Sequence, residues 1–385
     1  MKVVIAIDSF KGSISSIEAG TAAAAGVRDV FEEAEIITVP LADGGEGTVD
    51  ALIRAASGQR VDLMVTGPLG EPVQAGYGLL DGGATAVIEV AAACGLTLVS
   101  PEERDPLATT TFGVGELIAD ALERGCRRLI VGLGGSATSD AGAGMLQALG
   151  CALQDAHGAD IARGGGALAS LAAIDRSGLH PRLADGSVRI EVACDVDNPL
   201  HGPEGAAHVF APQKGASPAA VLQLDAGLRR FADVCREQLG CDVQRIPGAG
   251  AAGGLGAAFA GLLGAAMRPG AALVLEAAGF DRLLPHCDFV ITGEGRLDGQ
   301  TARGKAPLAV AAAAAARGIP VIALAGSIAP EADALASHGI TTALPIGPGP
   351  MPLEQAMQPE TALQGMRRTT RELFRLIRST KGDHH

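Results

Sequence analysis

The sequence VVIAIDSFKG, residues 3–12, decides the fold of this chain. Five apolar residues without polar alternation are typical of a strand that is buried on both faces of a parallel sheet. Asp8, Ser9 and Lys11 follow this strand directly, and ligands of open α/β sheets bind at the carboxyl ends of the strands. The stretch therefore predicts an α/β sheet with a carboxylate, a hydroxyl and a cation at its binding edge, although a simple helix cap is the alternative for Asp8.

Both ends of the chain continue this pattern. Helices are predicted at 16–31, at 305–317 and before the last strand, and strands at 35–39, 289–292, 319–324 and 342–346. Such alternation predicts a doubly wound, mostly parallel sheet with right-handed crossovers.

The middle of the chain differs. Strand-like runs at 61–66, 73–80 and 85–89 are separated by short turns, which predicts antiparallel hairpins. Strands at 129–131 and 188–193 and an amphipathic helix from Ser217 to Gly240 follow. We expect a mixed α/β domain, residues 58–285, inserted into a Rossmann-like domain of residues 1–57 and 286–385, with the active site in the cleft between them.

The composition of the chain argues against several classes of protein. The 385 residues carry a net charge of −13, no Trp and no basic run, which argues against nucleic-acid binding. The seven cysteines never form C-x-x-C, which indicates a reduced, cytoplasmic protein without a zinc site. The uncharged segment 246–267 is rich in glycine and predicts a buried helix entered from a loop, not a membrane span. The oligomeric state stays open.

Two acidic clusters follow predicted strands. The first contains Asp43, Gly44, Gly45 and Glu46, which suit a metal or a hydroxyl-bearing substrate, or an ordinary capping loop. The second contains Asp195 and Asp197, which suit Mg²⁺ or a general base, or plain Asx turns.

Two glycine runs could bind a phosphate. Residues 132–140 lie between a strand and a helix, where glycines free backbone N–H groups; the candidates are Gly134, Gly135, Ser136, Ala137, Thr138 and Asp140. Residues 132–137 also match the dinucleotide fingerprint G-x-G-x-x-A, with Asp155 further on, so a nicotinamide-dependent hydroxy-acid dehydrogenase is an alternative. The match at 248–253 follows no buried strand, which favours close helix packing, with a phosphate cradle still open.

The last cluster follows the strand at 289–292. It contains Glu294, Arg296, Asp298, Thr301, Arg303 and Lys305. Residues 299–305 match G-x-x-x-x-G-K, but Ala306 replaces the Ser or Thr that would bind Mg²⁺, so this is not a Walker A motif. Glycine loops, carboxylates and cations at strand ends together indicate phosphoryl transfer, which requires positioning, Mg²⁺ and cations.

Five runs in order along nearly the whole chain resemble the bacterial glycerate kinase family that forms 2-phosphoglycerate: residues 8–13, 40–48, 134–138, 194–200 and 292–301. The resemblance implies ATP-dependent phosphorylation of D-glycerate, in glyoxylate, glycolate or glucarate breakdown, by a two-domain α/β enzyme with its site in the interdomain cleft. It alone favours the 2-hydroxyl over the 3-hydroxyl. The chain departs from the family at residues 139–142, where Ala141 stands in place of a glycine and lacks its freedom at positive φ.

Residue chemistry and strand-end position suggest the roles. We expect Lys11, with Arg296, Arg303 or Lys305, to hold the glycerate carboxylate and the γ-phosphate of ATP. Asp195 or Asp43 would accept the hydroxyl proton. Metal contacts are expected from Asp197, Glu294 or Asp298, and phosphate contacts from residues 134–138 with Asp140. Substrate contacts are expected from Asp8, Ser9, Gly44, Gly45, Glu46, Thr301 and Arg303.

Overall fold

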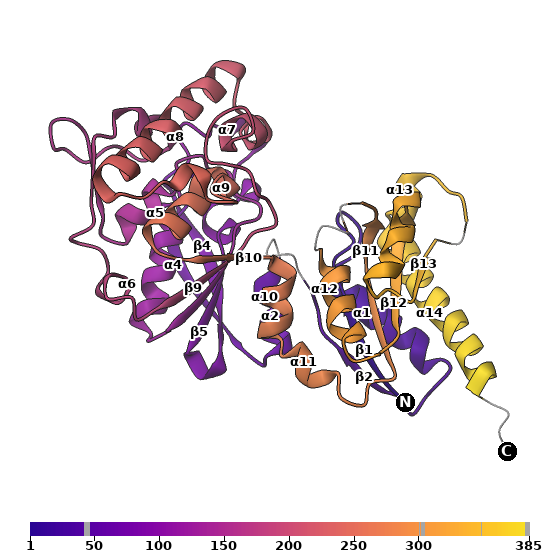
Figure 1. Cartoon of the computed structure of the whole chain (residues 1–385). Helices are drawn as coiled ribbons and strands as arrows, with labels where there is room; N and C mark the ends of the chain where they lie inside the picture. The colour runs from indigo at the N-terminus through magenta and orange to yellow at the C-terminus, as the bar shows by residue number, and fades with distance from the viewer. Residues whose placement is uncertain (42–46, 300, 302–304, 348, 382–385) are drawn as a thin grey trace. The chain divides into compact units, whose positions relative to one another are not determined.

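The chain forms two compact units. The computed structural model describes residues 1–41, 47–299, 301, 305–347 and 349–381. Unit 1 takes Met1–Asp43, Arg54–Ala56 and Pro269–His385, and unit 2 takes Gly44–Ile53 and Ser57–Arg268 (Figure 1). The boundaries near 57 and 286 stay a prediction.

Unit 1 contains a parallel sheet of five strands in the order β13-β12-β11-β1-β2. The strands are β1 (Lys2–Ile7), β2 (Glu35–Thr38), β11 (Phe289–Leu297), β12 (Val321–Ile328) and β13 (Thr342–Pro345). Ile5 lies opposite Ile291 on one side and Thr38 on the other. The chain leaves β1 toward β2 and later returns to β11 on the other side of β1, which is the predicted doubly wound order.

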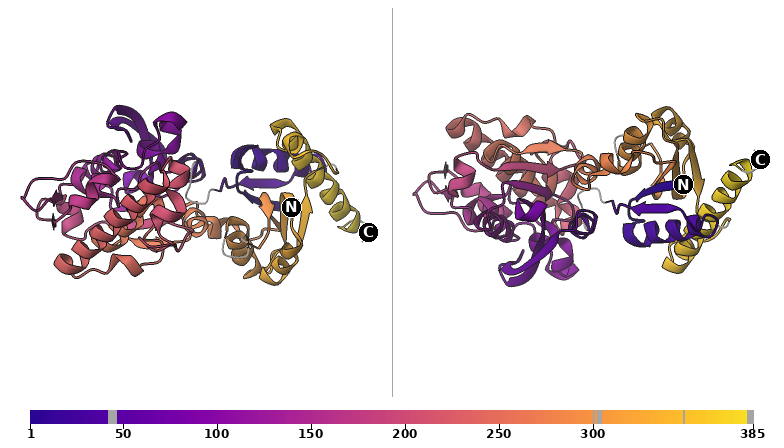
Figure 2. Two further views of the ribbon diagram at one scale, coloured as in Figure 1. Left: turned by 90° about the horizontal axis from the view of Figure 1, so that it is seen from above. Right: turned by 90° about the horizontal axis from the view of Figure 1, so that it is seen from below.

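Helices cover both faces of this sheet (Figure 2). They are α1 (Ser16–Arg28), α10 (Gly270–Ala277), α11 (Phe280–Leu283), α12 (Ala306–Ala315), α13 (Leu353–Ala356) and α14 (Pro359–Lys381). Val3, Ile5 and Ile7 share one core with apolar residues of α1 and α14, and α12 packs against β1, β11 and β12. Because strand side chains alternate between faces, α1 and α14 cover one face of the sheet and α12 covers the other.

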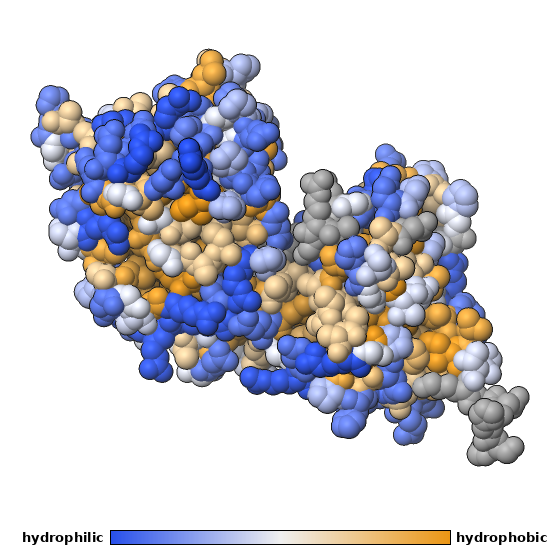
Figure 3. Space-filling view, viewed as in Figure 1, coloured by the Kyte–Doolittle hydropathy of each residue, from blue (hydrophilic) through white to orange (hydrophobic). Residues whose placement is uncertain are grey.

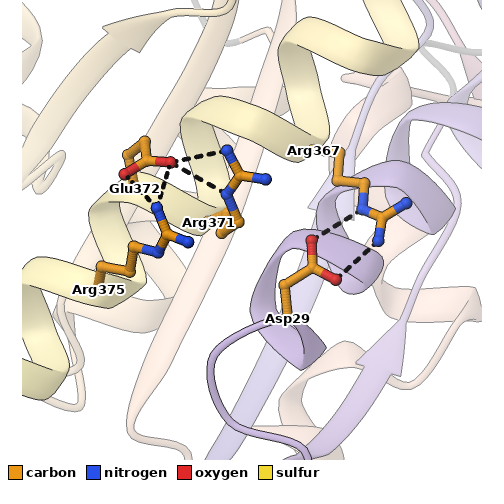
Figure 4. A network of polar contacts seen from close by, with 5 residues as sticks. All are labelled: Asp29, Arg367, Arg371, Glu372 and Arg375. Atoms are coloured by element: carbon orange, nitrogen blue, oxygen red, sulfur yellow. Dashed lines mark hydrogen bonds and ion pairs between the residues drawn. The ribbon is translucent and has the colours of Figure 1, made fainter.

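An ion pair joins α1 to α14. The guanidinium of Arg367 donates to both carboxylate oxygens of Asp29 at 2.7 and 2.8 Å, while Glu372 pairs with its neighbours Arg371 and Arg375 (Figure 4). The side-chain hydrogen bond from Arg367 lowers the pKa of Asp29. The pair therefore aligns two helices whose apolar faces already share a core.

Unit 2 contains a mixed sheet in the order β10-β9-β6-β5-β4-β3. Its strands are β3 (Gln59–Thr66), β4 (Pro72–Leu80), β5 (Thr85–Glu89), β6 (Arg128–Gly132), β9 (Arg189–Ala193) and β10 (Ala266–Arg268), and β7 (Ala152–Gln154) and β8 (Ala173–Asp175) form a separate pair. The helices within residues 44–268 are α2 (Thr48–Ala55), α3 (Ala91–Cys94), α4 (Phe112–Glu123), α5 (Ala143–Ala148), α6 (Pro181–Ala184), α7 (Ala206–Phe210), α8 (Pro218–Leu239) and α9 (Ala251–Ala257). The predicted hairpins are confirmed, since β3–β4 and β4–β5 are antiparallel.

Several predicted elements differ in length or kind. The helix expected before the last strand is a 3₁₀ segment, Pro330–His338, and the helix from residue 16 ends at Arg28. Strand β11 runs on to Leu297 because its end pairs with β12, where Arg296 lies opposite Ser327. In place of one long helix, the segment 246–267 holds the short helix α9, one π-helical turn and the start of strand β10, and residues 252–254 have positive φ, which interrupts a regular helix.

Among the described residues, no helix has the length and apolar character that a bilayer crossing requires. Hydrophilic and hydrophobic residues are intermixed on the visible faces of both units (Figure 3).

Candidate active site

A cavity of about 690 Å³ opens within unit 1, at the carboxyl ends of its parallel strands. Residues after β1 and at the end of β11 line one part of it, and residues at the end of β12 and after β13 line the rest. The connections of β1 and β11 leave the sheet in opposite directions here, and this switch point is the usual ligand site of an open α/β sheet. The volume is typical of a small-molecule or cofactor site.

The end of β1 brings Asp8, Ser9 and Lys11 to this cavity. Asp8 is 7% exposed, its N–H donates to the Gly293 carbonyl at 2.9 Å, and its Oδ1 accepts the N–H of Ser9 at 2.6 Å. Phe10 is buried and exchanges backbone hydrogen bonds with Ile14, so the turn between them presents Lys11 to solvent. The three residues predicted from the opening stretch therefore share one site.

The end of β11 contributes a buried acid. Glu294 is 7% exposed, its Oε1 accepts the Thr301 hydroxyl at 2.6 Å, and its Oε2 lies 3.5 Å from Nζ of Lys305. Burial raises the pKa of Glu294, and the hydrogen bond from Thr301 and the charge of Lys305 oppose that rise. Thr301 is itself fully buried and also accepts the N–H of Asp298 at 3.1 Å, so its hydroxyl positions acids of the cavity.

A second pair of opposite charges lies beside the first. Nε of Arg296 is 3.4 Å from Oδ2 of Asp298, and the arginine side chain is 69% exposed. Thr301 links the two acids, because its hydroxyl donates to Glu294 and accepts the backbone N–H of Asp298, and repulsion from Asp298 adds to the rise in the pKa of Glu294.

The carboxylate pair fits Mg²⁺. No group of three or more metal-ligating side chains occurs among the described residues. Mg²⁺ usually takes only one or two protein carboxylates and completes its shell with water and substrate phosphates. Glu294 and Asp298 supply that number at the cavity.

A second group of lining residues, here called the apolar wall, comes from the chain after β13. It consists of Ile346, Met351, Leu353 and Ala356 of α13, and Met357. Sequence reasoning missed this wall. The available signal was the run GPGPMPL at 347–353, in which Gly and Pro prevent a regular element while apolar residues remain at the end of a strand.

In unit 2, the run 132–140 forms a mostly buried loop. Gly135 is exposed and Gly134 is partly exposed, whereas Ser136, Ala137, Thr138 and Asp140 are all buried. The helix expected to start at this loop, α5, begins only at Ala143, so the loop does not sit at a helix N-terminus.

Two buried charges hold this loop. Asp140 accepts hydrogen bonds from the N–H and hydroxyl of Thr111 and from the N–H groups of Gly142 and Gly144. Nζ of Lys214 donates to Oγ of Ser136 at 3.0 Å and to the carbonyl of Thr138 at 2.5 Å, and burial lowers the pKa of Lys214 to about 8. Lys214 was missed from the sequence, where it follows no predicted strand.

The dinucleotide interpretation of this run fails on its context. Asp155 follows β7, which belongs to a separate two-stranded sheet and not to the sheet of β6. Its carboxylate accepts the N–H groups of His157 and Ala159 in its own loop, where the fingerprint requires an acid at the end of the neighbouring strand. In the other glycine match, Gly253 packs against the backbone of the loop 132–140, since a Cβ there would clash with the Thr138 carbonyl, and a phosphate cradle at 248–253 stays a prediction.

The remaining candidates are placed as follows. Asp195 and Asp197 follow β9 in unit 2 and are exposed. Asp43, Gly44, Gly45, Glu46 and Arg303 lie outside the described residues.

Comparison with known proteins gives consistent results. The family model described as "Glycerate kinase family" matches residues 3–378. The chain is 51% identical to glycerate kinase of Bacillus subtilis (strain 168) over 99% of both chains, and 51% identical to glycerate 2-kinase of Escherichia coli (strain K12) over 88% of this chain and 89% of that one. A crystal structure of a relative from Salmonella typhimurium LT2 matches all of both chains with a TM-score of 0.87 and 46% identity.

Proposed function

Because this chain belongs to the glycerate kinase family, we propose that it transfers the terminal phosphoryl group of ATP to the 2-hydroxyl of D-glycerate, giving 2-phosphoglycerate and ADP. The observation that supports this beyond similarity is the cavity of unit 1, where cations and carboxylates converge at the switch point of a parallel sheet. Phosphoryl transfer needs such groups mainly for positioning and charge stabilisation.

The charge of each residue in the cavity suggests its role. Lys11, Arg296 and Lys305 offer positive charge to phosphate oxygens and to the substrate carboxylate. Glu294 and Asp298 would hold Mg²⁺, which neutralises charge on the phosphates when bound. Thr301 holds Glu294 in place, as Asp140 and Lys214 hold the loop 134–138 in unit 2. For the general base, Asp195 or Asp43 stays our proposal, as do substrate contacts from Asp8, Ser9, Gly44, Gly45, Glu46 and Arg303.

The reaction involves small molecules only, and we propose that it takes place in the cytoplasm. All seven cysteines are free thiols, which fits a reducing compartment.

The test is incubation with ATP, Mg²⁺ and D-glycerate, followed by proton-coupled phosphorus NMR of the product. We expect ADP release that depends on glycerate and a product signal split by one proton, because the 2-phosphate is attached to a CH group. Splitting by two protons would instead identify the 3-phosphate. A parallel incubation replaces ATP with NAD, and absence of ADP in the first together with NAD reduction in the second would contradict the kinase assignment.

A further inference from the structure

We propose that the apolar wall of the unit 1 cavity binds the adenine base of ATP, with the charged part of the same cavity facing its phosphates. The inference rests on the proposed function, because it assigns a subsite to the nucleotide that the reaction uses. In this wall, Met351, Leu353 and Met357 are the side chains that would contact the base.

Two kinds of side chain line the cavity. Three are cations at a strand end or helix start, Lys11, Arg296 and Lys305, and the residues after β13 are mostly apolar, with Met357 close to the Lys11 turn, since a Cβ on Gly12 would lie 2.9 Å from its Cε. A nucleotide needs both kinds of contact, because it carries an anionic phosphate chain and a flat aromatic base. Glycerate, a small polar acid, has no apolar face to cover such a wall, so its size and polarity leave most of this cavity unused.

The wall exposes large apolar side chains. Leu353 is 73% exposed and Met357 is 36% exposed, and both belong to the few large hydrophobic residues that the described part of the chain leaves open to solvent. Exposed apolar surface that lines a concave, polar-rimmed site usually marks ligand binding. Methionine side chains are flexible and polarisable, so they adapt well to the face and edge of an aromatic ring.

The loop 134–140 of unit 2, predicted to bind phosphates, is a weaker candidate for the nucleotide-binding site. Within residues 134–140, only the two glycines reach solvent, and Ser136, Thr138 and Asp140 are buried. Unit 1 therefore offers the larger accessible surface to a nucleotide.

The experiment compares the double variant Leu353→Ala, Met357→Ala with Leu376→Ala. Leu376 is 61% exposed on α14 of the same unit and does not line the cavity, so it controls for loss of surface leucine. In calorimetry with the ATP analogue AMP-PNP and Mg²⁺, the Kd of the double variant should be about tenfold higher than that of the wild type. The Kd of Leu376→Ala should equal that of the wild type. Tripolyphosphate, which has no base, should bind all three proteins equally.

The steady-state readout is separate. The KM for ATP should rise in the double variant, while the KM for glycerate should stay unchanged. Unaltered AMP-PNP binding, equally weakened tripolyphosphate binding or a raised KM for glycerate would each overturn the inference. If the wild-type protein shows no glycerate-dependent ADP release, the proposed function fails, and AMP-PNP binding still tests the base subsite.

Discussion

At the scale of single residues, two buried ionisable groups should make the activity and the stability of the protein depend on pH. Burial raises the pKa of Glu294 in the cavity of unit 1 and lowers the pKa of Lys214 in unit 2 to about 8. Both shifts have the sign that desolvation of the charged form requires. The pKa shifts have opposite signs, but both lead to a property that improves as pH rises: turnover for Glu294 and stability for Lys214.

For Glu294, the ionised form is the one that would hold Mg²⁺, so kcat/KM should fall as pH falls through its raised pKa. The hydroxyl of Thr301 donates to Glu294 and thereby favours ionisation. Thr301→Val removes that donor, so the acid limb of the pH profile should move to higher pH. The control is Thr21→Val, because Thr21 lies on the exposed surface of helix α1 and does not line the cavity. This variant should leave the acid limb of the pH profile where it is. An unchanged limb in Thr301→Val would show that Glu294 does not need to be ionised for turnover.

For Lys214, the folded protein binds fewer protons than the unfolded chain between about pH 8 and the ordinary lysine pKa of 10.5. Stability contributed by this residue should therefore rise with pH across that window. Relative to Lys214→Met, the wild type should gain about 2 kcal/mol of unfolding free energy between pH 7 and 9.5. Urea unfolding of both proteins at the two pH values measures this difference, and parallel pH dependences would contradict it.

At the scale of elements, the packing of α1 against α14 depends on a glycine. A Cβ at Gly26 would lie 2.5 Å from the carbonyl oxygen of Arg367 and 2.7 Å from Cβ of Thr370, closer than real contacts allow. The same atom at Gly20, six residues earlier in α1, would meet Thr38 at an ordinary 3.8 Å. The two glycines therefore form a matched pair within one helix.

Gly26→Ala should lower the free energy of unfolding by about 1–3 kcal/mol, because the helices must separate. Gly20→Ala should leave it unchanged or raise it by up to about 1 kcal/mol, because alanine is the better helix former. Thermal and urea unfolding of the two variants check this order. Equal effects would mean that α14 moves away without cost.

At the scale of the whole molecule, two separate hydrophobic cores stand out. The larger core lies within unit 2, the other lies between the sheet of unit 1 and helices α1 and α14, and the two have no residue in common. Separate cores permit separate unfolding transitions.

Calorimetric scans should therefore resolve two transitions, and Gly26→Ala should lower only the one that belongs to unit 1. AMP-PNP with Mg²⁺ should raise that same transition, because a ligand of the unit 1 cavity stabilises the state that binds it by about 2.7 kcal/mol at a hundredfold excess over Kd. A single transition, or a ligand effect confined to the other one, would contradict this.

The fold was largely readable in the sequence. The apolar strand at 3–7, the glycines and prolines at helix ends and the short turns of residues 61–89 act through neighbours along the chain, so their patterns predict the parallel sheet, the hairpins and helix α8 directly. Asp8, Lys11 and Glu294 were predicted for the same reason, since the end of a parallel strand is a local feature.

Only the tertiary structure decided what these residues contact. In the folded chain, Ser136, Thr138 and Asp140 are buried, and Lys214 donates a hydrogen bond to Ser136 of the same loop. Strand β11 is longer than predicted because it pairs with β12, and the apolar run after β13 lines the cavity. Burial and long-range contacts depend on which distant segments pack together, and the free energy of that packing cannot be deduced from neighbouring residues along the chain.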